Sequence, residues 1–244
     1  GTLWINIGDT IKGKELLGIP WILALELKKN KWFLRSDIIW SKTNPMPESC
    51  TDRPSKAHEY VFLFSKSTQY YYDMESIREK TGANKRSVWS LSNSKLSNQH
   101  FATFPEELIS PMIKSGTSQH GCCSECGAPF KRIKEPSDAY NAIRGKGFSE
   151  NSTPNKVGKN TGFRGVDGCL FLGQKYNTIG WKETCEHKCD KPNRCVVMDI
   201  FMGSGTTAVV AKRCGRNFTG IELNGDYVEI INNRLDTKQK ELFE

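Results

Sequence analysis

The sequence predicts an α/β fold with a doubly wound, mostly parallel sheet that is interrupted by a cysteine-rich insert. Segments with strand and helix patterns alternate over residues 1–116 and again over residues 196–244. Residues 117–195 differ, because they are rich in Gly, Ser, Asn and Cys. Alternating strands and helices are typical of parallel sheets covered by helices. We therefore expect three parts, 1–116, 117–195 and 196–244, with a mobile middle of the insert at about 130–180.

The composition favours a protein with a buried core and an anionic partner. The chain has 244 residues, of which 37% are hydrophobic, and a net charge of +8. It contains no apolar run of about 18 residues and no signal peptide, so we predict no membrane span. The positive charge favours nucleic acid as the partner, although it is equally compatible with a basic protein that has no such partner.

The first part begins with a strand and continues with a helix and further strands. Residues 2–7 have a strand pattern, and because the chain opens inside this strand we expect that an earlier stretch is missing. A helix starts at Pro20, which suits a first helical turn, and ends at the basic Lys28 and Lys29. Further strands are expected at 33–40, 60–64 and 86–91, and a short helix follows Phe104.

The last part repeats a strand–helix–strand–helix pattern. A strand at 196–198 leads to Asp199, and a helix at 206–214 is closed by Gly215, the residue type that most often follows a helix. A second strand is expected at 218–223, and Asn224 suits the cap of the final helix. Since so few elements follow, the other strands of the sheet must come from earlier in the chain. The half that contains residues 196–244 therefore follows the other half of the sheet in sequence.

The turn between strand and helix at residues 199–207 has the pattern of a ligand-binding loop. It reads Asp-Ile-Phe-Met-Gly-Ser-Gly-Thr-Thr. Glycines let a backbone approach a ligand, and the start of a helix offers free N–H groups. Glu222, roughly 20 residues further on, can accept hydrogen bonds from both ribose hydroxyls of an adenosine ligand. Nicotinamide or flavin binding is the weaker interpretation, because residues 199–202 separate the strand from the first glycine.

Several segments together resemble the DNA amino-methyltransferases, which modify cytosine N4 or adenine N6. The loop at 199–207 is followed by Gly-Ile-Glu-Leu and by a helix with Asn224 and Tyr227, which resembles the subgroup whose cofactor motif is C-terminal. The other matching segments extend the resemblance over nearly the whole chain outside residues 130–180. They are Leu3–Asp9, Ser36–Trp40 with Lys42 and Asn44–Pro47, Arg53–Lys56 with His58–Tyr60, and Phe101–Glu107.

The resemblance implies a Rossmann-like, S-adenosylmethionine-dependent methyltransferase fold. Residues 1–116 would then hold the target half, and residues 196–244 the cofactor half. Ile200 departs from the family, which usually has Pro at this position. The implied cofactor contacts are Asp199, Phe201, Gly203, Ser204, Gly205, Thr206, Thr207 and Glu222, with Phe101, Thr103 and Phe104 closing over the methionine end.

The family's catalytic tetrapeptide is missing from residues 1–244. It consists of Ser or Asp, then Pro-Pro, then an aromatic residue. Its polar side chain and a backbone carbonyl accept hydrogen bonds from the target amine, and the aromatic ring stacks on the flipped base. In the family it precedes the segment that resembles Leu3–Asp9. We therefore expect it before Gly1, predict no catalytic residue within this chain, and expect the chain alone to be inactive.

The cysteines predict a structural zinc site in a ribbon-like insert. Most of the nine lie between Cys122 and Cys195, and without a secretion signal such clustering favours metal over disulfides. Cys123 and Cys126 have the spacing of a zinc knuckle, with Cys122 as an alternative first ligand. Cys185 is expected to add a third ligand, and His187 or Cys189 the fourth; the resemblance favours His187. Reduced, metal-free cysteines are the alternative.

The predicted reaction is methyl transfer from S-adenosylmethionine to the exocyclic amine of cytosine in duplex DNA. The Asn44–Pro47 segment and the cysteine insert are more similar to the Ser-Pro-Pro members of the family, which more often modify cytosine. An adenine-specific enzyme and a non-catalytic DNA- or cofactor-binding remnant are the alternatives. Phosphate contacts are expected from Lys42, Arg53 and Lys56. No membrane or obligate protein partner is expected, and the expected location is the cytoplasm of a bacterial or phage-infected cell.

Overall fold

A computed structural model describes residues 1–93, 104–144 and 175–240. Its main sheet has the strand order β1-β5-β4-β6, formed by β1 (Thr2–Ile7), β4 (Phe33–Lys42), β5 (His58–Ser65) and β6 (Val88–Leu91). β5 pairs antiparallel with both β1 and β4, and only β4 and β6 are parallel. The prediction of a mostly parallel sheet is therefore wrong for these strands. The reason is that β4 returns to β5 through a loop without a crossover helix, which yields an antiparallel pair.

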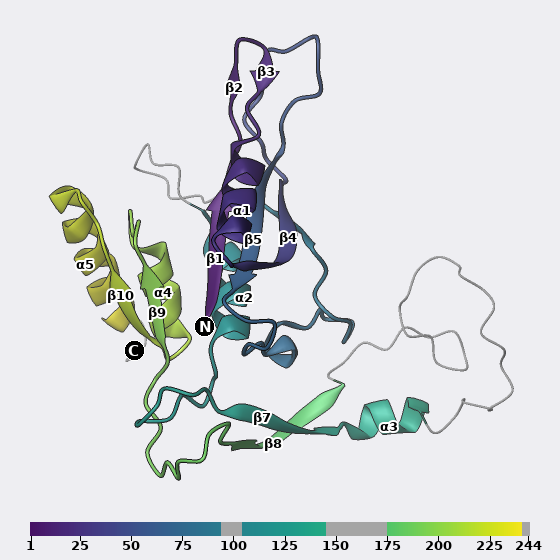
Figure 1. The fold of residues 1–244 in the computed structure, drawn as a ribbon, viewed down its shortest axis with the longest axis vertical. Helices are drawn as coiled ribbons and strands as arrows, with labels where there is room; N and C mark the ends of the chain where they lie inside the picture. Colours follow the sequence, from purple (N-terminus) through teal and green to yellow (C-terminus); the bar gives the residue numbers. More distant parts are fainter. Residues whose placement is uncertain (94–103, 145–174, 241–244) are drawn as a thin grey trace, which may run out of the picture.

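A second, two-stranded sheet is formed near the C-terminus. β9 (Val196–Asp199) and β10 (Asn217–Gly220) are parallel, and α4 (Thr206–Arg213) connects them. α5 (Gly225–Lys240) follows, and Asn224 Oδ1 caps it by accepting from the Asp226 N–H at 2.9 Å. β9 and β10 lie to the left of β1 in Figure 1. Within the described ranges, no strand pairs with the free edge of β1 or of β9.

Helices cover both faces of the main sheet. α2 (Glu106–Gly116) buries Leu108, Met112 and Ile113 against one face, in a core that also takes in Val210 of α4. α1 (Ile19–Lys29) covers the other face, where Ala24 packs with residues of β5. Successive residues of β5 serve opposite faces because strand side chains alternate. The core on the α2 side therefore joins the two sheets into one body.

A finger projects beyond the sheet at the top of Figure 1. It consists of the hairpin β2 (Ile11–Lys12) and β3 (Glu15–Leu16) beside the loop at 43–57. Its two-residue turn, Gly13–Lys14, has positive φ at both positions, as the twist of a tight hairpin requires. Lys14 pairs with Asp52 at 3.4 Å, which joins the two segments. The sequence patterns did not predict this hairpin.

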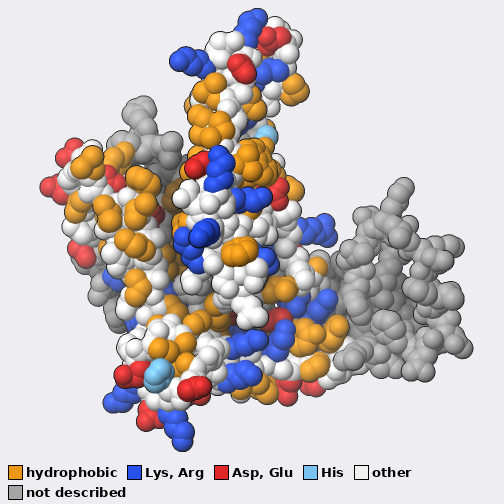
Figure 2. Space-filling model, in the orientation of Figure 1, with side chains coloured by type: hydrophobic (Ala, Val, Ile, Leu, Met, Phe, Trp, Pro, Cys, Tyr) orange, Lys and Arg blue, Asp and Glu red, His pale blue; other side chains and the backbone are white. Residues whose placement is uncertain are grey.

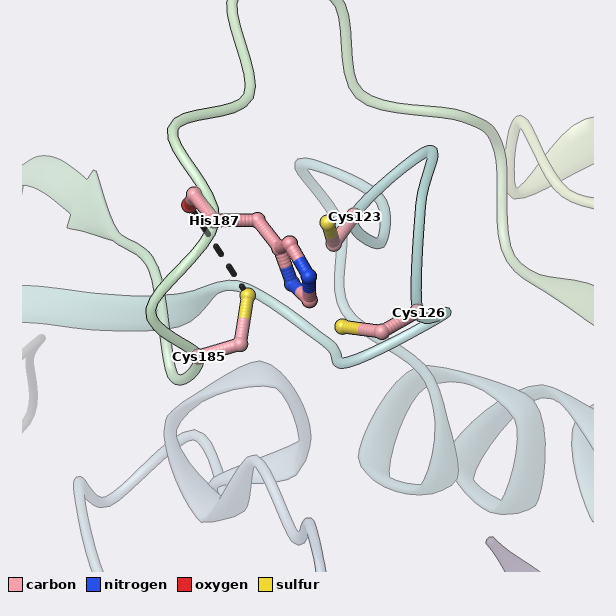
Figure 3. Close-up of side chains that lie close together, drawn as sticks. All are labelled: Cys123, Cys126, Cys185 and His187. Carbon is pink, nitrogen blue, oxygen red and sulfur yellow. Dashed lines mark hydrogen bonds between the residues drawn. The ribbon is translucent and has the colours of Figure 1, made fainter.

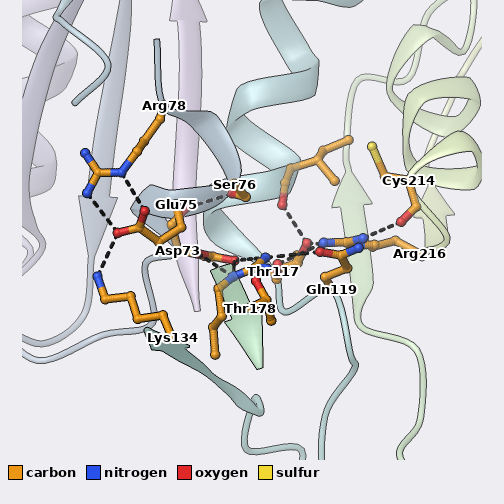
Figure 4. Close-up of polar contacts among 12 residues, drawn as sticks. Asp73, Glu75, Ser76, Arg78, Thr117, Gln119, Lys134, Thr178, Cys214 and Arg216 are labelled. Atoms are coloured by element: carbon orange, nitrogen blue, oxygen red, sulfur yellow. Dashed lines mark hydrogen bonds and ion pairs between the residues drawn. The ribbon is translucent and has the colours of Figure 1, made fainter. Parts of the chain in front are cut away.

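The insert contains more structure than predicted. β7 (Lys131–Pro136) and β8 (Tyr176–Lys182) form an antiparallel hairpin, and α3 (Asp138–Arg144) follows β7. These elements fall largely within the stretch of about 130–180 that was expected to be mobile, so regular structure is present where the sequence patterns indicated none. Arg132 holds the hairpin to the main body through buried Asp73, with a shortest contact of 2.7 Å. Lys134 adds an ion pair with Glu75 of the 3₁₀ helix η1 (Met74–Ile77), as Figure 4 shows.

Most predicted elements are present with small shifts of their ends. The strand expected at 218–223 is shorter, because β10 ends at Gly220 and leaves Glu222 in the following loop. The helix expected at 206–214 is α4, and Gly215 follows it with φ +72°. None of the described helices is long and apolar enough to cross a membrane.

Candidate functional site

Asp199 organises the turn at residues 199–207. Its Oδ1 accepts a hydrogen bond from the Phe201 N–H at 3.0 Å, and its Oδ2 accepts from the Thr207 hydroxyl at 2.6 Å. One carboxylate at the end of β9 therefore fixes both the start of the turn and the first turn of α4. Such double anchoring holds the backbone N–H groups of the loop in place before any ligand arrives.

Glu222 connects this turn to the loop after β10. Its Oε2 accepts from the Gly203 N–H at 2.7 Å, and its Oε1 accepts from the Asn224 N–H at 3.0 Å. These backbone hydrogen bonds, that of Asn224 first, hold the pKa of the Glu222 carboxyl below its usual value. The carboxylate is half-buried and has lone pairs left for a ligand. Asp199 and Glu222, which the sequence predicted to share a ligand site, therefore lie in two adjacent loops that are joined by hydrogen bonds.

The two glycines of the turn have different surroundings. A Cβ at Gly205 would lie 2.8 Å from Cγ1 of Ile231, so this glycine permits close packing of α5. A Cβ at Gly203 would meet nothing within 4 Å. Both residues have positive φ, which disfavours other residue types. Only Gly203 therefore has free space beside it for a ligand.

Arg234 of α5 is a residue that the sequence patterns missed. Its Nη1 donates to the Ser204 carbonyl at 2.5 Å and contacts the hydroxyl oxygens of Ser204 and Thr206 at 3.2 and 3.3 Å. Burial lowers the pKa of the guanidinium, although Glu106 opposes this. Arg234 follows Ile231 by one helical turn, and a basic residue on the core-facing side of α5 was the available signal. Ser204 and Thr206 are thus oriented by α5.

The other predicted cofactor residues vary in placement. Phe201 is 84% exposed. Figure 2 shows hydrophobic side chains gathered over the C-terminal elements β9, β10 and α5. Phe104 packs against the core shared by α2 and the main sheet. Phe101 and Thr103 lie outside the described residues. The structure therefore brings the loop at 199–207 and Glu222 together, as expected for one cofactor site. Phe104 instead packs against the hydrophobic core.

Four predicted metal ligands come together in the insert. The ligand atoms of Cys123, Cys126, Cys185 and His187 all lie within 4.8 Å of one another, as Figure 3 shows. Burial raises the pKa of Cys185 to about 11, and the neighbouring thiols of Cys126 and Cys123 add to this. Hydrogen bonding to the Ala128 backbone lowers the pKa of Cys126. Three sulfurs and one imidazole are a donor set that suits zinc.

Cys189, the alternative fourth ligand, lies beside this cluster. It is buried, and its sulfur is 3.4 Å from the Ser124 backbone nitrogen. Cys122 is not a member of the cluster either, and it forms an antiparallel bridge with Asn193 that closes the base of the insert. The geometry therefore favours Cys123 as the first ligand and His187 as the fourth.

The three basic residues expected to contact DNA already have partners in the protein. Lys42 pairs with Glu59 at 2.5 Å, and Arg53 pairs with Glu48 at 2.7 Å. Lys56 Nζ donates to the Asp9 carbonyl at 2.5 Å. Lys42 is the last residue of β4, and Arg53 and Lys56 lie in the loop at 43–57 that leads to β5. Contact with phosphates would require them to share or exchange these partners.

Comparison with known proteins identifies the family. The family model described as DNA methylase matches residues 1–123 and 188–233. The chain belongs to this DNA methylase family. Among similar proteins, the Type II methyltransferase M.Cfr9I of Citrobacter freundii is 32% identical, and M.XycI of Xanthomonas campestris pv. cyanopsidis is 31% identical. Each alignment covers 96% of this chain and 65% of the relative, so the chain spans about two thirds of their length.

A solved structure shares the fold of this chain. PvuII DNA methyltransferase, a cytosine-N4-specific enzyme, matches with a TM-score of 0.59 over 96% of this chain and 63% of that chain. The two sequences are 18% identical. The likeness therefore supports the mixed α/β methyltransferase architecture. The family model matches the chain on both sides of the cysteine-rich insert but not residues 124–187.

Proposed function

We propose that this DNA methylase transfers a methyl group from S-adenosylmethionine to the exocyclic amine of cytosine in duplex DNA. The observation that carries the proposal is the loop at 199–207, where Asp199 and Glu222 hold the backbone of a turn whose Gly203 has open space beside it. The cofactor's ribose hydroxyls would donate to Glu222. The other expected contacts complete the proposed cofactor site: Phe201, Gly203, Ser204, Gly205, Thr206 and Thr207, with Phe101, Thr103 and Phe104.

Cytosine is proposed as the target rather than adenine. Support comes from the Asn44–Pro47 segment and from the cytosine-N4 specificity of the PvuII enzyme, which shares the fold. The experiment is methyl transfer to duplex DNA by the protein expressed from its full coding sequence, followed by analysis of the digested nucleosides. N4-methylcytosine is expected. N6-methyladenine would establish the adenine-specific alternative, and no product with any DNA would favour a non-catalytic remnant.

A zinc ion is proposed at Cys123, Cys126, Cys185 and His187. The four ligand atoms come from the two ends of the insert and lie close enough to converge on one ion. All four coordination positions would be filled by protein, which is typical of structural rather than catalytic zinc. The ion would neutralise the crowded thiolates and hold the two ends of the insert together. No reaction step is assigned to it.

The three-part organisation follows from these assignments. We propose that residues 1–116 form the target half, 117–195 a zinc-ribbon-like insert, and 196–244 the cofactor half in permuted order. The supporting observations are that β1, β5, β4 and β6 form one sheet in the first part, that β9 and β10 form a separate sheet in the last part, and that the hairpin β7–β8 lies between them in sequence. Duplex DNA would bind over the carboxyl ends of β1, β4 and β9, near Lys42, Arg53 and Lys56. This is the edge at which open α/β sheets bind their ligands.

A further inference from the structure

An exposed methionine in the loop after β4 has no part in the assignments above. Met46 is 83% exposed, and among the described large hydrophobic side chains only those of Phe201 and Leu223 are more exposed. These two also lie in loops that follow the carboxyl end of a strand, β9 or β10, and both loops belong to the proposed cofactor site. Single exposed apolar side chains are common on protein surfaces, so exposure alone assigns no role to Met46.

The two prolines beside Met46 restrict its backbone. Pro45 and Pro47 each have a fixed φ, and a residue that precedes proline is confined to extended conformations. Both Asn44 and Met46 precede a proline. Residues 44–47 therefore have few conformations available. The methionine side chain is held in the solvent in advance, so that little further conformational entropy is lost when it meets a partner.

Hydrogen bonds anchor this stiff segment on both sides of Met46. Before it, Asn44 Oδ1 accepts from the Asn93 backbone N–H at 2.7 Å, and the Asn44 carbonyl accepts from Asn93 Nδ2 at 3.3 Å. Asn93 lies just after β6, so these contacts tie the segment to the edge of the main sheet. After it, Glu48 Oε2 accepts from Arg53 Nη1 at 2.7 Å, which closes the loop on itself. Met46 is therefore carried by a braced loop.

The loop lies at the edge of the sheet where the duplex is proposed to bind. β1 and β4 run in the same direction, since both are antiparallel to β5, and the loop at 43–57 follows the carboxyl end of β4 as part of the finger in Figure 1. Its two acids are each paired with a cation, Glu48 with Arg53 and Asp52 with Lys14. The loop can therefore approach DNA phosphates without strong repulsion, with Met46 exposed toward the solvent.

Building on the proposed function, we propose that Met46 is an apolar wedge that enters the duplex beside the target base and packs against the bases that are uncovered when the target is flipped out. Flipping breaks a base pair and its stacking contacts, which is costly in a matched duplex. Proteins that kink DNA offset similar costs by inserting apolar side chains, methionine among them, between bases. Methionine is unbranched and polarisable, so it suits an irregular gap in the stack. The wedge would stabilise the opened duplex without touching the reacting amine.

The test is single-turnover methyl transfer by the protein expressed from its full coding sequence, on a duplex that carries the sequence it methylates. Met46→Ala should lower the rate about tenfold or more on the matched duplex, as expected when most of an apolar side chain is removed from a buried contact. A second duplex has a mismatched base opposite the target, which makes the target easier to extrude. On this duplex the two proteins should agree within about threefold. Met46→Leu should keep most of the matched-duplex rate, and the polar Met46→Gln should not.

Ile179→Ala is the matched control. Ile179 is also exposed, at 56%, but it lies on β8, which is at the opposite end of the molecule from the finger in Figure 1. Its rates should equal those of the unaltered protein on both duplexes.

Three results would overturn the wedge. They are an unchanged rate of Met46→Ala on the matched duplex, an equal loss on both duplexes, and a lower thermal stability of Met46→Ala, which would mean that the side chain packs against the protein. Transfer that does not depend on Met46 would leave the proposed function intact. No transfer by the unaltered protein to any DNA would overturn the proposed function and the wedge together.

Discussion

At the scale of single residues, Glu222 has two tasks, because it orders the loop and is proposed to bind the ribose. Glu222→Ala removes the acceptor for the Gly203 and Asn224 N–H groups as well as for the ligand. We expect S-adenosylmethionine affinity to fall at least about tenfold, as loss of a charged acceptor does. Isothermal titration calorimetry on the full-length protein measures it. Glu229→Ala, an exposed acid on α5, is the control, and equal affinities for all three proteins would refute the ribose assignment.

The two glycines of the loop give a matched pair of variants. Gly205→Ala combines a positive φ, about 1–2 kcal/mol, with overpacking against Ile231, about 1–3 kcal/mol. Gly203→Ala carries only the first cost, because a Cβ there meets nothing within 4 Å. Urea unfolding should therefore show a larger loss of stability for Gly205→Ala. Cofactor affinity should instead fall in well-folded Gly203→Ala. The opposite order of stabilities would contradict the packing role of Gly205.

At the scale of elements, the sequence predicted the helix ends correctly, because they depend on interactions between neighbouring residues. Pro20, Gly215 and Asn224 mark helix ends because capping depends on neighbouring residues, and α1, α4 and α5 begin or end as expected. The hairpin β7–β8 was missed because its order depends on Arg132 reaching Asp73, a contact between distant parts of the chain. Likewise, no local pattern shows that β5 lies between β1 and β4. Both the β7–β8 hairpin and the central position of β5 depend on contacts between residues far apart in the sequence.

The same distinction applies to the candidate site. The spacing of Cys123 and Cys126, and the Asp-to-Thr loop, are local motifs, and the sequence alone was enough to find them. The choice between His187 and Cys189 was open from spacing, because both follow Cys185 closely. The fold separates them, since His187 faces the other three ligands and Cys189 packs beside Ser124. The contacts of Arg234 with Ser204 and Thr206 depend on tertiary packing and carry little local signal.

The zinc module gives an element-scale prediction. Protein purified without a metal-binding tag should contain about one zinc per chain by elemental analysis. Cys126→Ser should lower both the zinc content and the thermal stability, because metal binding contributes to folding. Cys189→Ser is the matched control, since its sulfur lies outside the cluster, and zinc content should be retained. Folded protein with no bound metal would refute the site, and loss of zinc in Cys189→Ser alone would reverse the ligand choice.

At the scale of the whole molecule, the two sheets meet through helices rather than through strands. Among the described residues, β1 and β9 each have an edge without a partner strand, and an unpaired edge can pair with another chain. Hydrophobic side chains are also exposed nearby, on α1 at Ile22 and Leu25 and on β9 at Val196 and Met198. A strand between β1 and β9 would complete one continuous sheet.

This arrangement leads to a prediction for residues 1–244 as an isolated polypeptide. The polypeptide should not methylate DNA, because the tetrapeptide that is expected to orient the target amine and to stack on the flipped base is not found in residues 1–244, and loss of such positioning costs several powers of ten in rate. The free edges of β1 and β9 should also make it prone to self-association. DNA binding should partly survive, since it depends on charge, and should weaken steeply as salt rises. The measurement is transfer of a labelled methyl group to mixed-sequence duplex DNA, with residues 1–244 and the full-length protein side by side. Robust turnover by residues 1–244 would mean that the amine is oriented by residues within this chain, and it would contradict the expectation that the catalytic motif lies outside residues 1–244.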